Sequence, residues 1–196
     1  MSFGSNLALV YQHLGRLTEA ATLYENLLAI QEAILGKDHF DNVTIINNMA
    51  TLKIEQNKFN EADLLFDNCL QILENQQFTN TKEYVDILYM KGLNLMNMEK
   101  YTDAKDYLAK AVIKAATVYG KYHKMYATIS VNMGYLLHKS KEPKQAAKHF
   151  IDGMNTLTVG YYLLISIVIF PCKSAYFCFF SWIASREFFI KFINTL

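Results

Sequence analysis

The amino-acid sequence repeats itself at a fixed offset of 42 residues, and this period constrains the fold more than any other feature. Shifting the chain by that offset aligns four copies without a gap. Two columns hold only small residues: Ala8, Ala50, Gly92 and Gly134 in one, and Ala20, Ala62, Ala104 and Ala146 in the other. Another column holds large apolar residues: Tyr24, Phe66, Leu108 and Phe150. Each copy therefore predicts the same supersecondary unit, and the four units predict a stacked array.

The unit that fits these columns is a pair of antiparallel α-helices. Two helices approach to about 8–10 Å when a small side chain stands where they cross, which explains the Ala and Gly columns. The large columns then fill the space toward the next copy. Glycine and proline interrupt helices, and the chain contains only 8 and 2 of them. The sequence therefore predicts an all-α protein of four helix-turn-helix repeats.

Helix ends can also be read from the aligned copies. Three polar residues share one register directly before the second helix and are predicted to cap it: Thr18, Asn60 and Thr102. In the fourth copy this helix is predicted to open with the proline geometry of Pro143 instead. Gly36 and Gly120 stand in the turns between repeats, where a left-handed backbone is expected to end the preceding helix.

No residue pattern points to catalysis or to a bound cofactor or metal ion. The histidines do not pair with cysteines or carboxylates at metal-ligand spacing, and His39 and His123 are predicted to make turn hydrogen bonds. Cys69 falls in a small-residue column and is expected in the core. The sequence has no glycine-rich phosphate loop and no nucleophile motif. Its net charge of +1 argues against a nucleic-acid partner. We therefore expect a protein that is not an enzyme.

The repeats resemble the tetratricopeptide family. The residues that carry the resemblance in the first copy are Asn6 to Tyr11, Gly15 to Leu17, Glu19, Ala20 and Tyr24. The 42-residue period, with Leu35 to His39 between copies, is similar to the longer-helix variety of kinesin light chains. The resemblance covers residues 1–157 and implies a right-handed superhelix of about four repeats. It also implies a concave surface, lined by the first helices, that binds a protein or peptide segment.

The registers that line this surface in the family map onto twelve positions of the chain. They are Asn6, Leu9 and His13; Asn48, Thr51 and Glu55; Met90, Leu93 and Asn97; and Asn132, Tyr135 and Lys139. Asn6, Asn48 and Asn132 form a ladder interrupted by Met90. A carboxamide offers two donors and an acceptor, so a row of them suits an extended peptide backbone. A single lysine among these positions disfavours a clamp for an acidic tail. A structural role for the asparagines, or simple exposure to water, is the competing interpretation.

The repeat register fails at about Thr158, and residues 158–196 form an apolar tail. Three interpretations remain open. Residues 159–184 are long enough to span a bilayer, although Pro171 and Lys173 lie near the centre. The tail could instead cap the last repeat, or it could be translated non-coding sequence that begins at Val159.

Taken together, these patterns predict a cytoplasmic scaffold that binds a protein or peptide segment. The alternative is an adaptor anchored in a membrane through residues 159–184, for which a mitochondrial assembly factor of the same repeat class would be one example. The sequence leaves the oligomeric state open.

Overall fold

The computed structural model describes the backbone of residues 3–168 and the side chains of residues 4–156. Eight α-helices make up this part of the chain: α1 Phe3–His13, α2 Leu17–Leu35, α3 Asn42–Glu55, α4 Phe59–Asn75, α5 Lys82–Asn97, α6 Tyr101–Val118, α7 Lys124–Lys139 and α8 Pro143–Val168. The chain divides into two compact units, Met1–Tyr119 with α1 to α6 and Gly120–Leu196 with α7 and α8. The predicted all-α class is confirmed.

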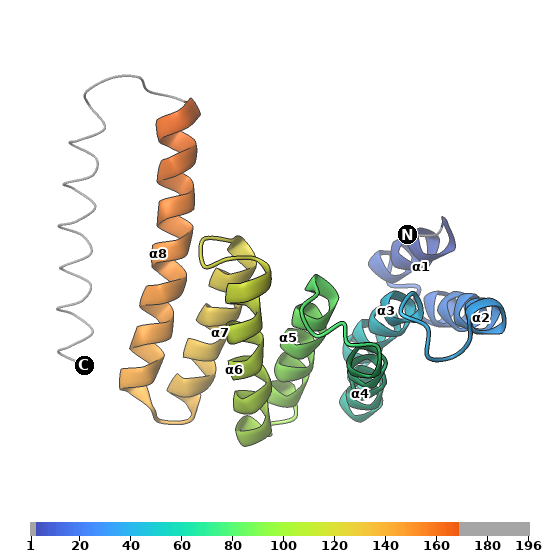
Figure 1. Ribbon diagram of the computed structural model, residues 1–196. Coiled ribbons are helices and arrows are strands. Elements are labelled where there is room, and N and C mark those ends of the chain that lie inside the picture. The colour runs from blue at the N-terminus through green and yellow to red at the C-terminus, as the bar shows by residue number, and fades with distance from the viewer. Residues whose placement is uncertain (1–2, 169–196) are drawn as a thin grey trace. The chain divides into compact units, whose positions relative to one another are not determined.

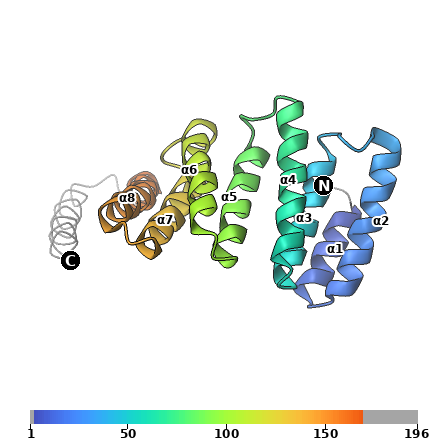
Figure 2. The ribbon, with the colours of Figure 1, turned by 90° about the horizontal axis from the view of Figure 1, so that it is seen from below.

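The first unit consists of three stacked hairpins (Figure 1). Each hairpin pairs a first helix with a second one: α1 with α2, α3 with α4, and α5 with α6. The second helix of each repeat also packs on the first helix of the next, α2 on α3 and α4 on α5, and Figure 2 shows these helices side by side. The first helices touch one another as well, α1 on α3 and α3 on α5.

The second unit contains the fourth hairpin, formed by α7 and α8. Thr156 of α8 donates a hydrogen bond to the carbonyl of Lys121, before α7, over 2.8 Å. Helix α8 continues through Thr158 as far as Val168, so the backbone stays helical past the point where the repeat register fails. Residues 169–196, the larger part of the apolar tail, lie outside the described residues. Within the described part, no helix combines the length and the apolar character that crossing a membrane needs.

The small-residue columns lie where the helices of each hairpin cross. Every alanine in them is buried. A Cβ atom added to Gly92 would stand 2.7 Å from the Leu108 side chain, and one added to Gly134 would stand 3.0 Å from the Phe150 ring. Larger residues would separate the helices, so the packing confirms the predicted crossings.

The turn inside each repeat has the same backbone conformation four times. Gly15, Asn57, Glu99 and Lys141, spaced by 42 residues, all have φ between 58° and 73°. The next residue in each copy donates its N–H to the carbonyl five residues before it, as Arg16 does to Tyr11 over 2.9 Å. This is the left-handed helix ending that glycine favours. Only the first copy has glycine there, so composition does not reveal the turn.

The predicted caps of the second helices are wrong. Helices α2, α4 and α6 begin one residue before Thr18, Asn60 and Thr102, and the residues that precede these helices make no side-chain cap hydrogen bond. The reason is the left-handed turn, which leads directly into the helix and leaves those polar residues inside its first turn. Pro143 does open α8, as predicted.

The predictions for the turns between repeats are confirmed. Gly36 and Gly120 have φ values of 91° and 85°. The Nδ1 atoms of His39 and His123 accept hydrogen bonds from the backbone N–H groups of Asp41 and Met125, over 3.2 and 3.1 Å.

Candidate functional site

All twelve positions assigned to the binding surface retain contact with solvent. Seven are exposed and five are half-buried: Asn6, Leu9, His13, Glu55, Asn97, Tyr135 and Lys139 in the first group, and Asn48, Thr51, Met90, Leu93 and Asn132 in the second. Nine of them lie on α1, α3 and α5 in the first unit, where these helices touch in sequence. The other three lie on α7 in the second unit. We call the nine positions in the first unit the first-helix face.

The asparagines of the ladder differ in how they are engaged. Among the described residues, the side chains of Asn6 and Asn48 make no hydrogen bond. The Nδ2 atom of Asn132 instead donates to the carbonyl of Thr128, one turn earlier in its own helix, over 2.9 Å. Of the three ladder asparagines, those of the first two repeats are therefore the ones whose carboxamides make no hydrogen bond within the described fold.

Other polar positions of the face are held by neighbours. Gln12 donates through Nε2 to Oε1 of Glu55 over 2.7 Å, which links α1 to α3. The Thr51 hydroxyl donates to the carbonyl of Asn47, over 3.0 Å. The contacts of Glu55 and Thr51 fix the directions of these two polar groups on the first-helix face. In the second unit, the Lys139 ammonium lies 5.6 Å from the centre of the Tyr135 ring.

A second feature, which the sequence analysis missed, is a buried charge between α4 and α5. The Lys91 side chain is 3% exposed, and its Nζ atom lies 2.6 Å from Oδ1 of Asp63 and 3.0 Å from Oδ2 of Asp67. The ring of Tyr107, from α6, has its centre 5.0 Å from the same ammonium. Burial alone would lower the pKa of Lys91, but its bonds to the two carboxylates outweigh that effect and raise it.

The buried charge of Lys91 could have been predicted from the alignment of the 42-residue copies. Lys91 stands in the column of Leu7, Met49 and Met133, where the other copies carry apolar residues. Two aspartates spaced by four residues share a face of the preceding helix. A lone charge in an apolar column, facing such a pair, predicts a buried ion pair.

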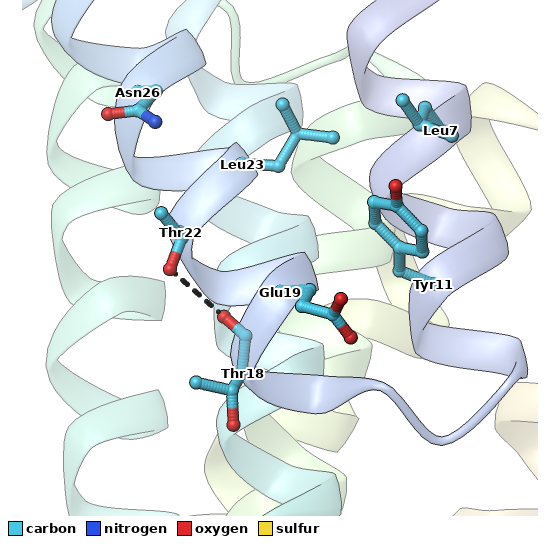
Figure 3. Close-up of a pocket in the computed structure, with 7 residues that line it drawn as sticks. All are labelled: Leu7, Tyr11, Thr18, Glu19, Thr22, Leu23 and Asn26. Carbon is cyan, nitrogen blue, oxygen red and sulfur yellow. Dashed lines mark hydrogen bonds between the residues drawn. The ribbon is translucent and has the colours of Figure 1, made fainter.

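The third repeat and the first repeat carry equivalent pockets. The pocket of the third repeat has a volume of about 410 Å³ and is lined by Asp63, Asp67, Lys91, Leu95, Lys100, Asp103, Asp106, Tyr107 and Lys110. That of the first repeat, drawn in Figure 3, has a volume of about 370 Å³. Its lining is Leu7, Tyr11, Thr18, Glu19, Thr22, Leu23 and Asn26. Adding 84, or two repeats, to these seven positions gives six that line the third-repeat pocket. The pockets therefore differ mainly in chemistry: the third is charged, and the first is largely apolar.

Neither pocket brings together, among the described residues, the side chains that a metal site or an activated nucleophile needs. Among the described residues, no three His, Cys, Asp or Glu side chains come together as metal ligands. Cys69 lies in the core, as predicted, and burial raises the pKa of its thiol to about 12. The first-helix face and the two pockets offer a partner hydrogen bonds, apolar contacts and charged side chains.

Comparison with known proteins agrees with this architecture. Models of the tetratricopeptide repeat match residues 3–75 and 85–112, which together are more than half of the chain. No curated protein matches the sequence. The crystal structure of BtubC (BKLC) from P. vanneervenii is similar, with a TM-score of 0.73 and 19% identity, over 78% of this chain and 60% of that one. This chain thus matches less than two thirds of that protein's length.

Two further solved structures resemble the chain. A Podosopora anserina putative kinesin light chain with nearly identical TPR-like repeats gives a TM-score of 0.70 at 15% identity, over 86% of this chain and 76% of that one. The apo form of RapI gives a TM-score of 0.70 at 15% identity, over 96% and 70%. At such low identity these structures share the fold alone. With the repeat models matching on both sides of residue 80, the chain belongs to the tetratricopeptide repeat family.

Proposed function

We propose that this protein is a non-catalytic adaptor that holds a segment of a partner protein on its first-helix face. Tetratricopeptide repeats serve in general as scaffolds for protein interaction, which supports the class of function. The observation that carries the proposal is the pair of unengaged carboxamides, Asn6 and Asn48, placed one repeat apart on α1 and α3.

The chemistry of the face favours an extended segment of modest charge. Each free carboxamide offers two donors and one acceptor, which matches the alternating groups of a peptide backbone. Leu9, which is 37% exposed on α1, provides apolar contact beside them. Glu55 is the acidic side chain among the nine positions, and no lysine or arginine is among them. A partner rich in carboxylates would therefore find no cation on this face.

The first prediction concerns these asparagines. A partner is first recovered with the full-length chain as bait, then purified, and its affinity is measured by calorimetry. The Asn6→Ala/Asn48→Ala variant should bind it about tenfold more weakly or worse, because each lost hydrogen bond contributes about 0.5–1.5 kcal/mol. The thermal melting temperature should stay near that of the unaltered protein, because neither side chain bonds within the described fold.

The matched control is the equivalent asparagine pair on the second helices. Asn26 and Asn68 are also exposed and also lie one repeat apart, on α2 and α4. Full affinity in the Asn6/Asn48 variant, or an equal loss in the Asn26→Ala/Asn68→Ala variant, would remove the first-helix face as the binding site.

We propose that this adaptor is cytoplasmic. The alternative, anchoring through residues 159–184, depends on a segment that lies largely outside the described residues. Extraction of cell membranes with alkaline carbonate distinguishes the two: release of the protein supports the proposal, and retention contradicts it.

A further inference from the structure

The first repeat leaves open a surface that the later repeats of the same unit cover. Leu7 and Val10 of α1 are 47% and 51% exposed. In the second repeat, Leu52, the equivalent of Val10, is 1% exposed and packs in one cluster with Ala20 and Tyr24 of α2, and Met49, the equivalent of Leu7, is half-buried against the same cluster. Lys91, the equivalent of Leu7 in the third repeat, is enclosed by α4. Within the first unit, this surface is therefore normally occupied by the second helix of a neighbouring repeat.

The open surface is mainly apolar. It comprises the exposed side chains of Leu7, Val10 and Leu14 and the half-buried side chains of Tyr11 and Leu23, and we call it the open α1 face. Figure 3 shows Leu7 and Tyr11 of α1 opposite Leu23 and Glu19 of α2, around the first-repeat pocket. Contiguous exposed apolar side chains of this kind mark a contact surface.

Comparison with the third repeat defines the helix that would fit. There the buried position is the cation Lys91, and α4 presents the two aspartates that pair with it. In the first repeat the same position is Leu7, so the covering helix needs apolar residues at the positions of Asp63 and Asp67. A carboxylate placed against Leu7 would lose its hydration without gaining a partner.

Among the four second helices of the described residues, α8 carries apolar residues at both positions. The residues in these two registers are Ala21 and Glu25 on α2, Asp63 and Asp67 on α4, Lys105 and Ala109 on α6, and Ala147 and Ile151 on α8. Met154 extends the same face of α8, one turn further, and is 47% exposed. Its equivalent on α4, Leu70, lines a pocket together with Leu88 of α5.

We propose that the open α1 face binds α8 of a second copy of this chain, in the manner in which α4 covers α5. The contact joins two different surfaces, so it is heterologous and adds copies head to tail into a ring or an open chain. It uses neither Asn6 nor Asn48 and is independent of the proposed binding of a partner segment.

Sedimentation velocity of the full-length chain over a concentration series tests this inference. The unaltered protein should form species larger than the monomer as concentration rises. Leu7→Lys and Ala147→Asp should each weaken the association at least about tenfold, because each places one unpaired charge in an apolar contact. The double variant Leu7→Lys/Ala147→Asp should restore it, since it recreates between copies the Lys91–Asp63 pair that measures 2.6 Å within one copy.

Two further variants complete the test, one as a control and one as a replacement for Leu7→Lys. Ile113→Lys, at a position that is 68% exposed on α6, removes an equally apolar side chain away from the open α1 face and should leave the association unchanged. Circular dichroism melts establish that each variant is folded, and Val10→Lys replaces Leu7→Lys if the latter unfolds. A monomer at every concentration would overturn the inference. So would association that survives both single changes, or that the double variant fails to restore.

Discussion

Four residues spaced by one repeat hold the turn between the two helices of each hairpin in a left-handed conformation. They are Gly15, Asn57, Glu99 and Lys141. Residues with a Cβ atom adopt this conformation at a cost of about 1–2 kcal/mol, which glycine avoids and asparagine partly avoids. Glu99 and Lys141 are exposed, so the repeats gain nothing in packing that would offset the strain there.

Because of this strain, we predict that substitutions at two of these positions change the stability in opposite directions. Glu99→Gly should raise the free energy of unfolding by up to about 1 kcal/mol, and Gly15→Ala should lower it by about 1–2 kcal/mol. Both are measured by chemical denaturation. Glu99→Ala is the control, because alanine keeps the Cβ atom and the strain. If Glu99→Gly and Glu99→Ala have equal stabilities, backbone strain is not what this position contributes.

At the scale of elements, the contact between α4 and α5 is held by groups that titrate in alkali. The Tyr84 hydroxyl donates to Oε1 of Glu74 over 2.8 Å. Burial, aided by this bond, raises the pKa of Tyr84 from 10.0 to about 12. The pKa of Lys91 is also raised, because its two carboxylate partners outweigh the opposing effect of burial. Both groups therefore keep their protons in the folded chain at a pH where the unfolded chain has lost them.

The sign of the pH dependence follows from these two pKa shifts. The contribution of Tyr84 to stability is complete below about pH 10 and is lost as the pH rises toward about 12, and the contribution of Lys91 is likewise lost as the pH rises. Tyr84→Phe, which cannot ionise, should make the decline in the free energy of unfolding across this range shallower. Urea denaturation at a series of pH values measures it, with Tyr122→Phe, at a tyrosine that is 74% exposed, as the control. The same slope in the Tyr84→Phe variant and the unaltered protein would contradict the assignment.

At the scale of the whole molecule, the sequence predicts those features of the fold that recur with the 42-residue period. The four hairpins, the crossings at Ala20, Ala62 and their equivalents, and the core position of Cys69 all follow from columns of residue size. Size patterns reveal packing because a crossing tolerates only small side chains, whatever the rest of the sequence. The two turn histidines were predictable for the same reason, since they recur at a multiple of the period.

Features that depend on the direction of a side chain or of the backbone, rather than on the size of a side chain, could not be predicted from the sequence. The sequence places Asn132 in the same column as Asn48, but only coordinates show that its amide turns back to Thr128. Likewise, a polar residue before a helix suggests a cap, and only the left-handed turn shows that Thr18 already lies inside α2. The equivalence of the two pockets also required the structure, because their lining residues differ in type at most positions.

The central claim is that a partner lies on the first helices, and site-specific photo-crosslinking tests it most directly. A photoreactive phenylalanine is placed singly at Leu9 of α1 and Asn97 of α5, and for comparison at Leu64 of α4 and Ile113 of α6. Leu9, Leu64 and Ile113 are 37%, 71% and 68% exposed, and Asn97 is exposed as well, so all four positions can reach a bound protein. We predict covalent adducts with the purified partner from Leu9 and Asn97, and none from Leu64 or Ile113. Adducts from the second-helix positions alone would contradict the proposed function.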